Sequence, residues 1–341
     1  MSEHPHTSRE VRLAAVPSGI PRPEDFTVAE APVPEPGPGE VLVKNRFFHV
    51  FAALRTLIGG SVEGAPFAGL RPGDPLFGPA IGEVVTAPAG GDLRPGELVA
   101  HWRGWREYAV LDAEGCEPLG AALPDPVAHL SQARTAYEAL TRAQVRPGDV
   151  VFVSGGAGSV GSMAGQIARL LGAGRVVGST GSPAKAERMV AEFGYDAAVV
   201  RGAGPLEEQL AKAAPDGVDV LFDNVGGEDL RAAVAAARKD ARFVLVGALS
   251  GQMSDRGGGT TSPVELDSFQ LIVKQITMIG YSNPGRAGVD TEWLDRFAGW
   301  LRSGEIAFPY VRVPGIENAP RALHDMMSGR HLGTVVVALE D

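Results

Sequence analysis

Residues 150–168, VVFVSGGAGSVGSMAGQIA, constrain the fold more than any other stretch of this 341-residue chain. They begin with four β-branched or aromatic residues, pass through a cluster of glycines, and end in apolar residues repeated at helical spacing. The glycines and serines argue against a membrane span, which needs about twenty predominantly apolar residues. The order of strand, glycine turn and helix therefore predicts one unit of a doubly wound parallel sheet, an α/β fold.

The glycine turn has the spacing G-x-G-x-x-G of a dinucleotide site. Glycines let the backbone amides approach a pyrophosphate, and the helix that follows offers unpaired N–H groups. The alternative is a tight strand-to-helix turn without a ligand, and the chain's 45 glycines make chance matches common. We expect the hydroxyls of Ser154 and Ser159 to face phosphate rather than to act as nucleophiles. The predicted cofactor contacts in this turn are Gly156, Gly158, Ser159, Val160 and Gly161.

Composition narrows the partners of the chain. A net charge of −10 disfavours nucleic acid and anionic membranes, and the N-terminus lacks the apolar region of a secretory signal. The single cysteine, Cys116, excludes an internal disulfide framework and fits a reducing compartment. We therefore expect a cytoplasmic protein that acts on a small molecule and binds neither nucleic acid nor a membrane. A homodimer is an expectation that the sequence leaves open.

The sequence has two parts that differ in composition and in their pattern of predicted elements. Residues 11–125 are rich in proline and glycine, with short β-like runs at 40–44 and 82–85, and predict a compact, mostly antiparallel domain. From residue 126 a predicted helix at 127–144 is followed by alternating helices and strands, which predict a parallel sheet. The glycine-rich run at 256–262 is expected to be a mobile loop. The predicted strands are 150–153, 175–180, 197–200, 218–225, 242–247 and 276–282.

The segment after the second strand indicates which dinucleotide binds. NAD-specific folds place an acid there to bind the adenosine ribose, but no acid occurs here before Glu187. Lys185 lies in this segment and can attract a 2′-phosphate through a charge-assisted hydrogen bond. The alternative is that Lys185 is only a solvated helix residue. The sequence predicts NADPH as the cofactor.

Several motifs then show a resemblance. The stretches 154–169, 192–196, 217–228, 243–250 and 331–337, above all FDNVGGE at 222–228, resemble the zinc-independent medium-chain dehydrogenase/reductase superfamily. Within it, the chain resembles the alkenal, enone and prostaglandin double-bond reductases. The resemblance implies a GroES-like substrate domain built from residues 1–126 and 288–341, around a Rossmann domain at 127–287. Substrate and nicotinamide are expected to lie in the cleft between them.

The resemblance also implies further cofactor contacts. Arg201 falls where the family has a tyrosine that binds the adenosine phosphate, and this change strengthens a 2′-phosphate contact unless the arginine is simply exposed. His331 falls where the family has an asparagine, and it can still donate a hydrogen bond. The contacts implied in this way are Thr180, Gly181, Lys185, Arg201, Asn224, Gly247, Ala248, Leu249, Ser250, Ser282 and His331.

A zinc site is not expected. Catalytic zinc needs three well-placed ligands and structural zinc usually needs four cysteines, whereas this chain has one cysteine and seven unclustered histidines. Where zinc-dependent relatives carry Gly-His-Glu, this chain reads GPAIG at 78–82. We therefore predict a reductase that needs no metal.

Without a Lewis acid, reduction of a conjugated C=C bond is the favoured chemistry. Hydride adds to the β-carbon, and hydrogen-bond donors must stabilise the enolate before the α-carbon is protonated. The tyrosine implicated in several relatives is replaced by Val273, and their Asp-Pro-Tyr-Met-Arg segment reads FAALR at 51–55. Ordinary packing or a surface ion pair is the alternative for each replacement candidate. These catalytic candidates are Tyr281, Arg55 and Tyr137.

The apolar replacements predict a roomier, more apolar substrate pocket, although aromatic residues in a β domain are more often core. Two enzyme readings stay open: a simple enone reductase, and a biosynthetic reductase of a large polyene or polyketide-like substrate that couples reduction to ring closure. Quinone reduction and non-catalytic NADPH binding are further alternatives. The residues proposed to line the pocket are Phe47, Phe48, Phe51, Trp102 and Trp105.

Overall fold

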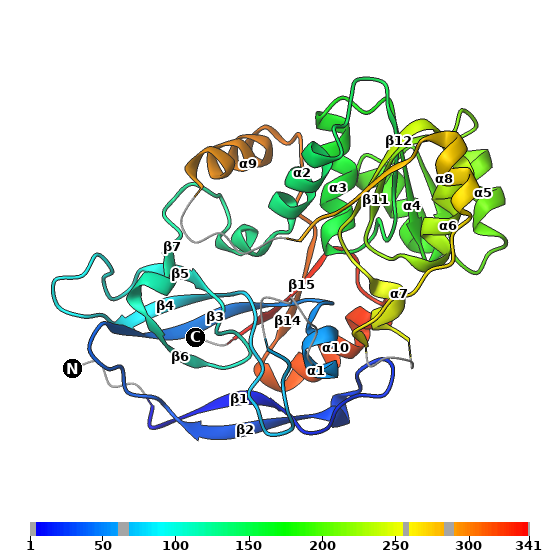
Figure 1. Cartoon of the computed structure of the whole chain (residues 1–341). Coiled ribbons are helices and arrows are strands. Elements are labelled where there is room, and N and C mark those ends of the chain that lie inside the picture. The colour runs from blue at the N-terminus through cyan, green and yellow to red at the C-terminus, as the bar shows by residue number, and fades with distance from the viewer. Residues whose placement is uncertain (1–4, 61–67, 255–258, 283–289, 340–341) are drawn as a thin grey trace.

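The computed structural model describes residues 5–60, 68–254, 259–282 and 290–339. Two sheets lie side by side, one parallel and covered by helices, the other mostly antiparallel (Figure 1). This confirms the predicted α/β fold class with a second, β-rich part. In the described part of the chain, no helix is both long and apolar enough to cross a bilayer.

The parallel sheet has six strands in the order β10-β9-β8-β11-β12-β13. Strand β8 is at its centre and all four of its residues are buried. Its alternate residues point into two separate cores, one on each face, as the two-residue period of a strand requires. The strands are β8 (Val150–Val153), β9 (Arg175–Thr180), β10 (Ala197–Val200), β11 (Val218–Asp223), β12 (Ala237–Leu245) and β13 (Thr277–Gly280).

Helices cover both faces of this sheet (Figure 1). Helices α2, α3 and α9 share one core, while α5 and α6 belong to the other. Strand order reverses beside β8, and ligands of such sheets bind at the carboxyl ends of the strands near this point. The helices are α2 (Ala133–Arg142), α3 (Ser159–Leu170), α4 (Pro183–Glu192), α5 (Leu206–Ala213), α6 (Gly227–Ala236), α7 (Leu249–Gln252), α8 (Ser268–Lys274) and α9 (Thr291–Ser303).

Some predicted boundaries were wrong. The helix expected at 127–144 is a 3₁₀ turn, η3 (Pro126–Leu130), followed by α2, because Ser131 is extended and interrupts the helix. Asp125 caps the 3₁₀ turn by accepting a hydrogen bond from the Val127 amide at 2.9 Å. Strand β12 begins at Ala237, five residues before the predicted start. Residues 256–258 of the run expected to be a mobile loop lie outside the described residues.

The second sheet has seven strands in the order β14-β15-β3-β4-β5-β7, with β6 paired to β3 off this path. Strand β15, near the C-terminus, pairs antiparallel with β3, so both ends of the chain build this sheet. The strands are β3 (Glu40–Val50), β4 (Ala80–Thr86), β5 (Leu98–His101), β6 (Tyr108–Asp112), β7 (Glu117–Pro118), β14 (Tyr310–Pro314) and β15 (Thr334–Ala338).

A hairpin of β1 (Thr7–Leu13) and β2 (Phe26–Pro32) and several short helices complete the fold. The proposed domain boundaries at 126 and 288 remain a prediction. Helix α9 lies after the second boundary, yet its Phe297 and Ala298 pack in the core shared with α2 and α3. The remaining helices are η1 (Pro23–Asp25), α1 (Leu54–Gly59), η2 (Ala113–Gly115), η5 (Ile316–Asn318) and α10 (Ala319–Met327).

Candidate cofactor and substrate site

The glycine turn between β8 and α3 has a backbone that only glycine permits at two positions. Gly155 has a φ of 62°, in the left-handed region. A Cβ atom on Gly161 would overlap the carbonyl oxygen of Gly155 and lie 2.7 Å from the Cα of Gly156. By contrast, a Cβ on Gly158 would make an ordinary contact of 3.4 Å. The motif reading missed Gly155, although the Gly155-Gly156 pair was a signal for a left-handed turn.

Helix α3 begins at this turn without a side-chain cap in the described structure, since its N-cap residue is Gly158. Its first N–H groups therefore lack the partner that a capping side chain normally supplies, and they suit an anion such as a pyrophosphate. The Gly333 amide donates to the carbonyl of Ala157 at 2.9 Å, and the hydroxyls of Ser159 and Thr334 are 2.6 Å apart. The turn is thus tied to the start of β15 in the other sheet.

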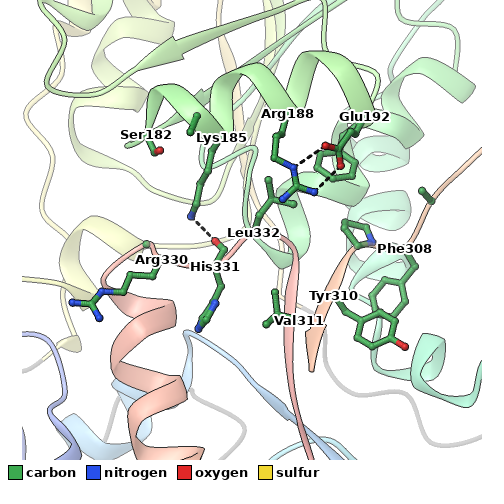
Figure 2. A pocket seen from close by; sticks show the side chains of 15 residues that line it. Ser182, Lys185, Arg188, Glu192, Phe308, Tyr310, Val311, Arg330, His331 and Leu332 are labelled. Carbon is green, nitrogen blue, oxygen red and sulfur yellow. Dashed lines mark hydrogen bonds and ion pairs between the residues drawn. The ribbon is translucent and has the colours of Figure 1, made fainter. Parts of the chain in front are cut away.

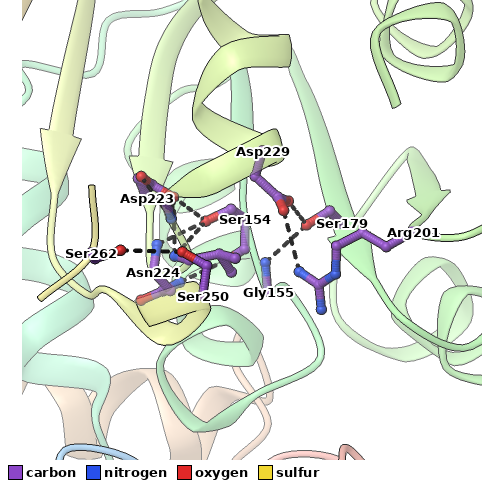
Figure 3. Close-up of polar contacts among 11 residues, drawn as sticks. Ser154, Gly155, Ser179, Arg201, Asp223, Asn224, Asp229, Ser250 and Ser262 are labelled. Carbon is purple, nitrogen blue, oxygen red and sulfur yellow. Dashed lines mark hydrogen bonds and ion pairs between the residues drawn. The ribbon is translucent and has the colours of Figure 1, made fainter. Parts of the chain in front are cut away.

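The prediction that the Ser154 hydroxyl faces a phosphate was wrong, because this hydroxyl is bonded inside the protein. It is fully buried, donates to the Asp223 carboxylate at 2.6 Å and accepts from the Asn224 amide at 2.8 Å (Figure 3). The Asn224 side chain in turn donates to the Ser154 carbonyl at 2.8 Å. Ser154 and Asn224 therefore lock together the loops that follow β8 and β11.

The loop after β12 joins the same cluster. The Gly247 amide donates to the Asp223 carbonyl at 3.0 Å, and the Leu249 amide donates to the Asn224 carbonyl at 3.1 Å. A Cβ on Gly247 would lie 2.6 Å from the Asn224 carbonyl oxygen, so the approach of the two loops requires glycine there. The glycine turn, Asn224 and residues 247–250, which are far apart in sequence, thus come together at the carboxyl edge of the sheet.

Lys185 lies on α4, where its ammonium group donates to the backbone carbonyl of His331 (Figure 2). Burial lowers the pKa of Lys185, and the nearby Arg201 lowers it further, so the two cations share one region. The carbonyl is neutral and leaves the charge of Lys185 uncompensated by this contact. In contrast, Arg188 on the same helix forms two contacts of 2.7 Å with the Glu192 carboxylate.

A cavity of about 790 Å³ opens beside Lys185, between α4, β14 and residues 329–332 (Figure 2). His331 lines it, and burial is the main reason that the pKa of this imidazole is lowered. A neutral imidazole can donate one hydrogen bond and accept another. Because Lys185 lines this cavity, the cavity lies next to the predicted 2′-phosphate end of the site.

The three catalytic candidates occupy separate places, and each is bonded to protein groups. Tyr281 follows β13 and its hydroxyl donates to Glu138 on α2 at 2.7 Å. Arg55 is fully buried, and its Nε donates to the Gly19 carbonyl at 2.8 Å. The Tyr137 hydroxyl accepts from Arg296 at 2.9 Å, within an aromatic cluster between α2 and α9. Of the three, Tyr281 lies at the carboxyl edge of the parallel sheet.

Val273 occupies the position of the tyrosine that is implicated in several relatives. Val273 is on α8 and is 57% exposed, beside the exposed Ile272. The proposed apolar pocket was partly wrong: Phe48 and Trp105 are fully buried and contact each other in the core, with ring centroids 5.1 Å apart. Phe47 is half-buried and packs under Arg312. Phe51 and Trp102 also keep exposed surface, with their rings edge to face.

Among the described residues, no three His, Cys, Asp or Glu side chains form a group that could hold a metal ion. Cys116 is buried among apolar residues, and this burial raises the pKa of its thiol to about 11. Zinc binds the thiolate form, so this environment opposes zinc binding by Cys116.

Comparison with known proteins finds similar dehydrogenases and reductases. The family model described as zinc-binding dehydrogenase matches residues 159–297, and one described as N-terminal domain of oxidoreductase matches residues 9–119. Prostaglandin reductase 1 of Oryctolagus cuniculus is 32% identical, over 92% of this chain and 88% of its own. The NADPH-dependent curcumin reductase of Escherichia coli is 27% identical, over 99% and 98%. The structure of CurA from Vibrio vulnificus in complex with NADPH superimposes with a TM-score of 0.87, at 28% identity, over 98% and 99%.

Proposed function

The chain belongs to the zinc-binding dehydrogenase family, in the alkenal and enone reductase branch of the medium-chain dehydrogenase/reductases. From this premise we propose that it reduces a conjugated C=C bond of an enone-type substrate without zinc. It is an NADPH-dependent oxidoreductase that acts on C=C bonds. The observation that carries the cofactor part of the proposal is the glycine turn, where α3 begins without a side-chain cap. Lys185 and Arg201, which lie near each other, add two cations for the cofactor's phosphates.

The residues of this chain fit NADPH. The glycine turn leaves no room for a Cβ at Gly161 and keeps the N–H groups of α3 open toward an anion. We propose that the turn and α3 hold the pyrophosphate, and that Lys185 and Arg201 hold the 2′-phosphate. The loops at Asn224 and Gly247 are proposed to flank the nicotinamide. When bound, NADPH supplies the hydride.

The chain's own part in the chemistry is to supply a proton. We propose Tyr281 as the donor, because it is the catalytic candidate at the carboxyl edge of the sheet. The present hydrogen bond to Glu138 must open before the hydroxyl can protonate the α-carbon of the substrate. Glu138 is in turn held by Arg134, whose Nε lies 2.9 Å from its other carboxylate oxygen.

Replacing Tyr281 and Glu138 should therefore have different consequences. In Tyr281→Phe we expect kcat to fall about 5-fold, with the dissociation constant of NADPH unchanged, because water only partly replaces the lost proton donor. Glu138→Gln should not lower kcat, because Glu138 holds the Tyr281 hydroxyl but is not the proposed proton donor. Stopped-flow turnover and a fluorescence titration measure both quantities.

The control is Tyr310→Phe, which removes a hydroxyl that also donates to a carboxylate, that of Asp125 at 2.9 Å. This variant should turn over like the wild type. Equal kcat in wild type and Tyr281→Phe would show that solvent or another group donates the proton.

Chelation tests the metal-free proposal. After exhaustive dialysis against EDTA, we expect NADPH consumption with a good acceptor to stay within twofold of the untreated rate, since Cys116 is poorly suited to bind zinc. Metal content by mass spectrometry and the activity are measured on the same sample. A loss of activity that zinc alone restores would contradict the proposal.

The substrate class is tested by NADPH consumption with a panel of enones, quinones and polyenes. We expect steady turnover with enones and saturated products by mass spectrometry. Turnover with quinones alone would favour a quinone reductase. An absence of turnover, with NADPH bound tightly, would favour a non-catalytic NADPH-binding protein.

A further inference from the structure

A buried carboxylate lies under the adenosine end of the site. Asp229, in the first turn of α6, is 1% exposed, and its Oδ1 accepts a hydrogen bond from the hydroxyl of Ser179 on β9. The Ser179 hydroxyl also accepts from the Gly155 amide at 3.0 Å (Figure 3). Asp229 is thus linked through Ser179 to the glycine turn, at the carboxyl end of the second strand.

This position has a known meaning in dinucleotide folds. An acid at the end of the second strand binds the adenosine ribose of NAD and repels a 2′-phosphate. Here the local segment after β9 has no acid before Glu187, yet α6 brings Asp229 to the same strand end. A carboxylate in this place conflicts with NADPH binding unless its charge is compensated.

Arg201 supplies the compensating charge. It follows β10, and its Nη1 lies 3.3 Å from Oδ2 of Asp229 (Figure 3). Its side chain is 26% exposed and that of Asp229 is 1% exposed, so the guanidinium is the more accessible member of the pair. Its Nη2 lies 3.9 Å from where a Cβ on Gly181 would be, beside the segment that carries Lys185.

We propose that Arg201 masks Asp229, which means that the guanidinium neutralises the charge of the carboxylate toward the cofactor. This ion pair, rather than the absence of an acid, then permits NADPH selectivity at this site. Arg201 then has two roles, attracting the 2′-phosphate and cancelling a latent NAD-type carboxylate. The inference rests on the proposed placement of the 2′-phosphate near Lys185 and Arg201.

The charges make the two roles separable. Removing Arg201 leaves a carboxylate that repels the 2′-phosphate and can accept a hydrogen bond from the ribose of NADH. The pKa of Asp229 is raised, chiefly by burial and to a smaller extent by Asp223. Arg201 and Ser179 oppose this rise. Removing Asp229 as well eliminates the repulsion and leaves only the lost attraction. The two substitutions should therefore be strongly non-additive.

The test is a double-mutant cycle on the full chain, with dissociation constants of NADPH and NADH measured by fluorescence titration at pH 8. Arg201→Ala should lower the preference for NADPH over NADH at least ~10-fold, and adding Asp229→Asn should recover at least about 5-fold of it. Asp229→Asn alone should change NADPH affinity less than about twofold. If Arg201→Ala does not fold by circular dichroism, Arg201→Gln keeps a hydrogen-bond donor for Asp229 and replaces it in the cycle.

Lys185→Ala is the matched control, and it separates two kinds of failure. It should weaken NADPH binding in a way that Asp229→Asn does not rescue. If Lys185→Ala has no effect on NADPH, the proposed 2′-phosphate site is wrong. If Lys185→Ala weakens NADPH binding but Arg201→Ala shows no rescue by Asp229→Asn, the site stands and the masking role of Arg201 is overturned.

Discussion

Gly161→Ala is expected to weaken NADPH binding about 100-fold, because its new methyl group has no space in the turn. The methyl would overlap the Gly155 carbonyl and crowd the Cα of Gly156, and both are backbone atoms that cannot rotate away. The turn must therefore open, which moves the N-terminal amides of α3 away from the pyrophosphate position. Fluorescence titration with NADPH measures the loss, after circular dichroism and Tm have shown that the variant folds.

The control is Gly299→Ala on α9, outside the glycine turn. An added Cβ on Gly299 would meet no other heavy atom within 4 Å. We expect this variant to bind NADPH within about threefold of the wild type. Equal affinity in Gly161→Ala and wild type would show that the cofactor does not use this turn.

Lys185→Ala is expected to reduce the preference for NADPH over NADH 10- to 30-fold, since charge-assisted hydrogen bonds of partly buried groups are worth about 1.5–3 kcal/mol. The wild type should prefer NADPH at least about tenfold for the same reason. The Lys185 ammonium contacts a neutral carbonyl, that of His331, so its charge is available to a phosphate. Dissociation constants for both cofactors, measured at two salt concentrations, test the expectation.

Arg188→Ala is the control for Lys185, because Arg188 lies on the same helix and lines the same cavity. Its charge is already paired with Glu192 through two hydrogen bonds. The cofactor preference should therefore stay within about twofold of the wild type. A wild type that binds the two cofactors equally, or a Lys185→Ala variant with unchanged preference, would contradict the assigned 2′-phosphate site.

Local patterns predicted the elements that depend on local residues. The strands at Arg175–Thr180 and Ala197–Val200 have the predicted bounds, because short runs of apolar residues end at clear turn signals. The glycine turn was predicted because its strand and helix flank it directly in sequence. A substrate domain made from both ends of the chain was implied only by the family resemblance, and the pairing of β3 with β15 was not predicted, since nothing local indicates it.

Other features that the sequence reading missed depend on contacts between distant segments. The search for an acid after the second strand found none, since Asp229 reaches Ser179 from an element fifty residues later. The bond from Tyr281 to Glu138 joins residues 143 apart. Phe48 and Trp105 were assigned to a pocket because an aromatic pattern alone does not distinguish a core from a cleft wall.

The central claim is that the chain delivers hydride to carbon of a conjugated acceptor. The most direct test uses NADPH deuterated at the transferable C4 position with an enone that turns over, and locates the label in the product by NMR and mass spectrometry. We expect deuterium on the β-carbon and a solvent-derived proton on the α-carbon. Deuterium next to a newly formed ring bond would instead indicate reductive cyclisation, and deuterium on a carbinol carbon would contradict the account, because the enzyme would then be a carbonyl reductase.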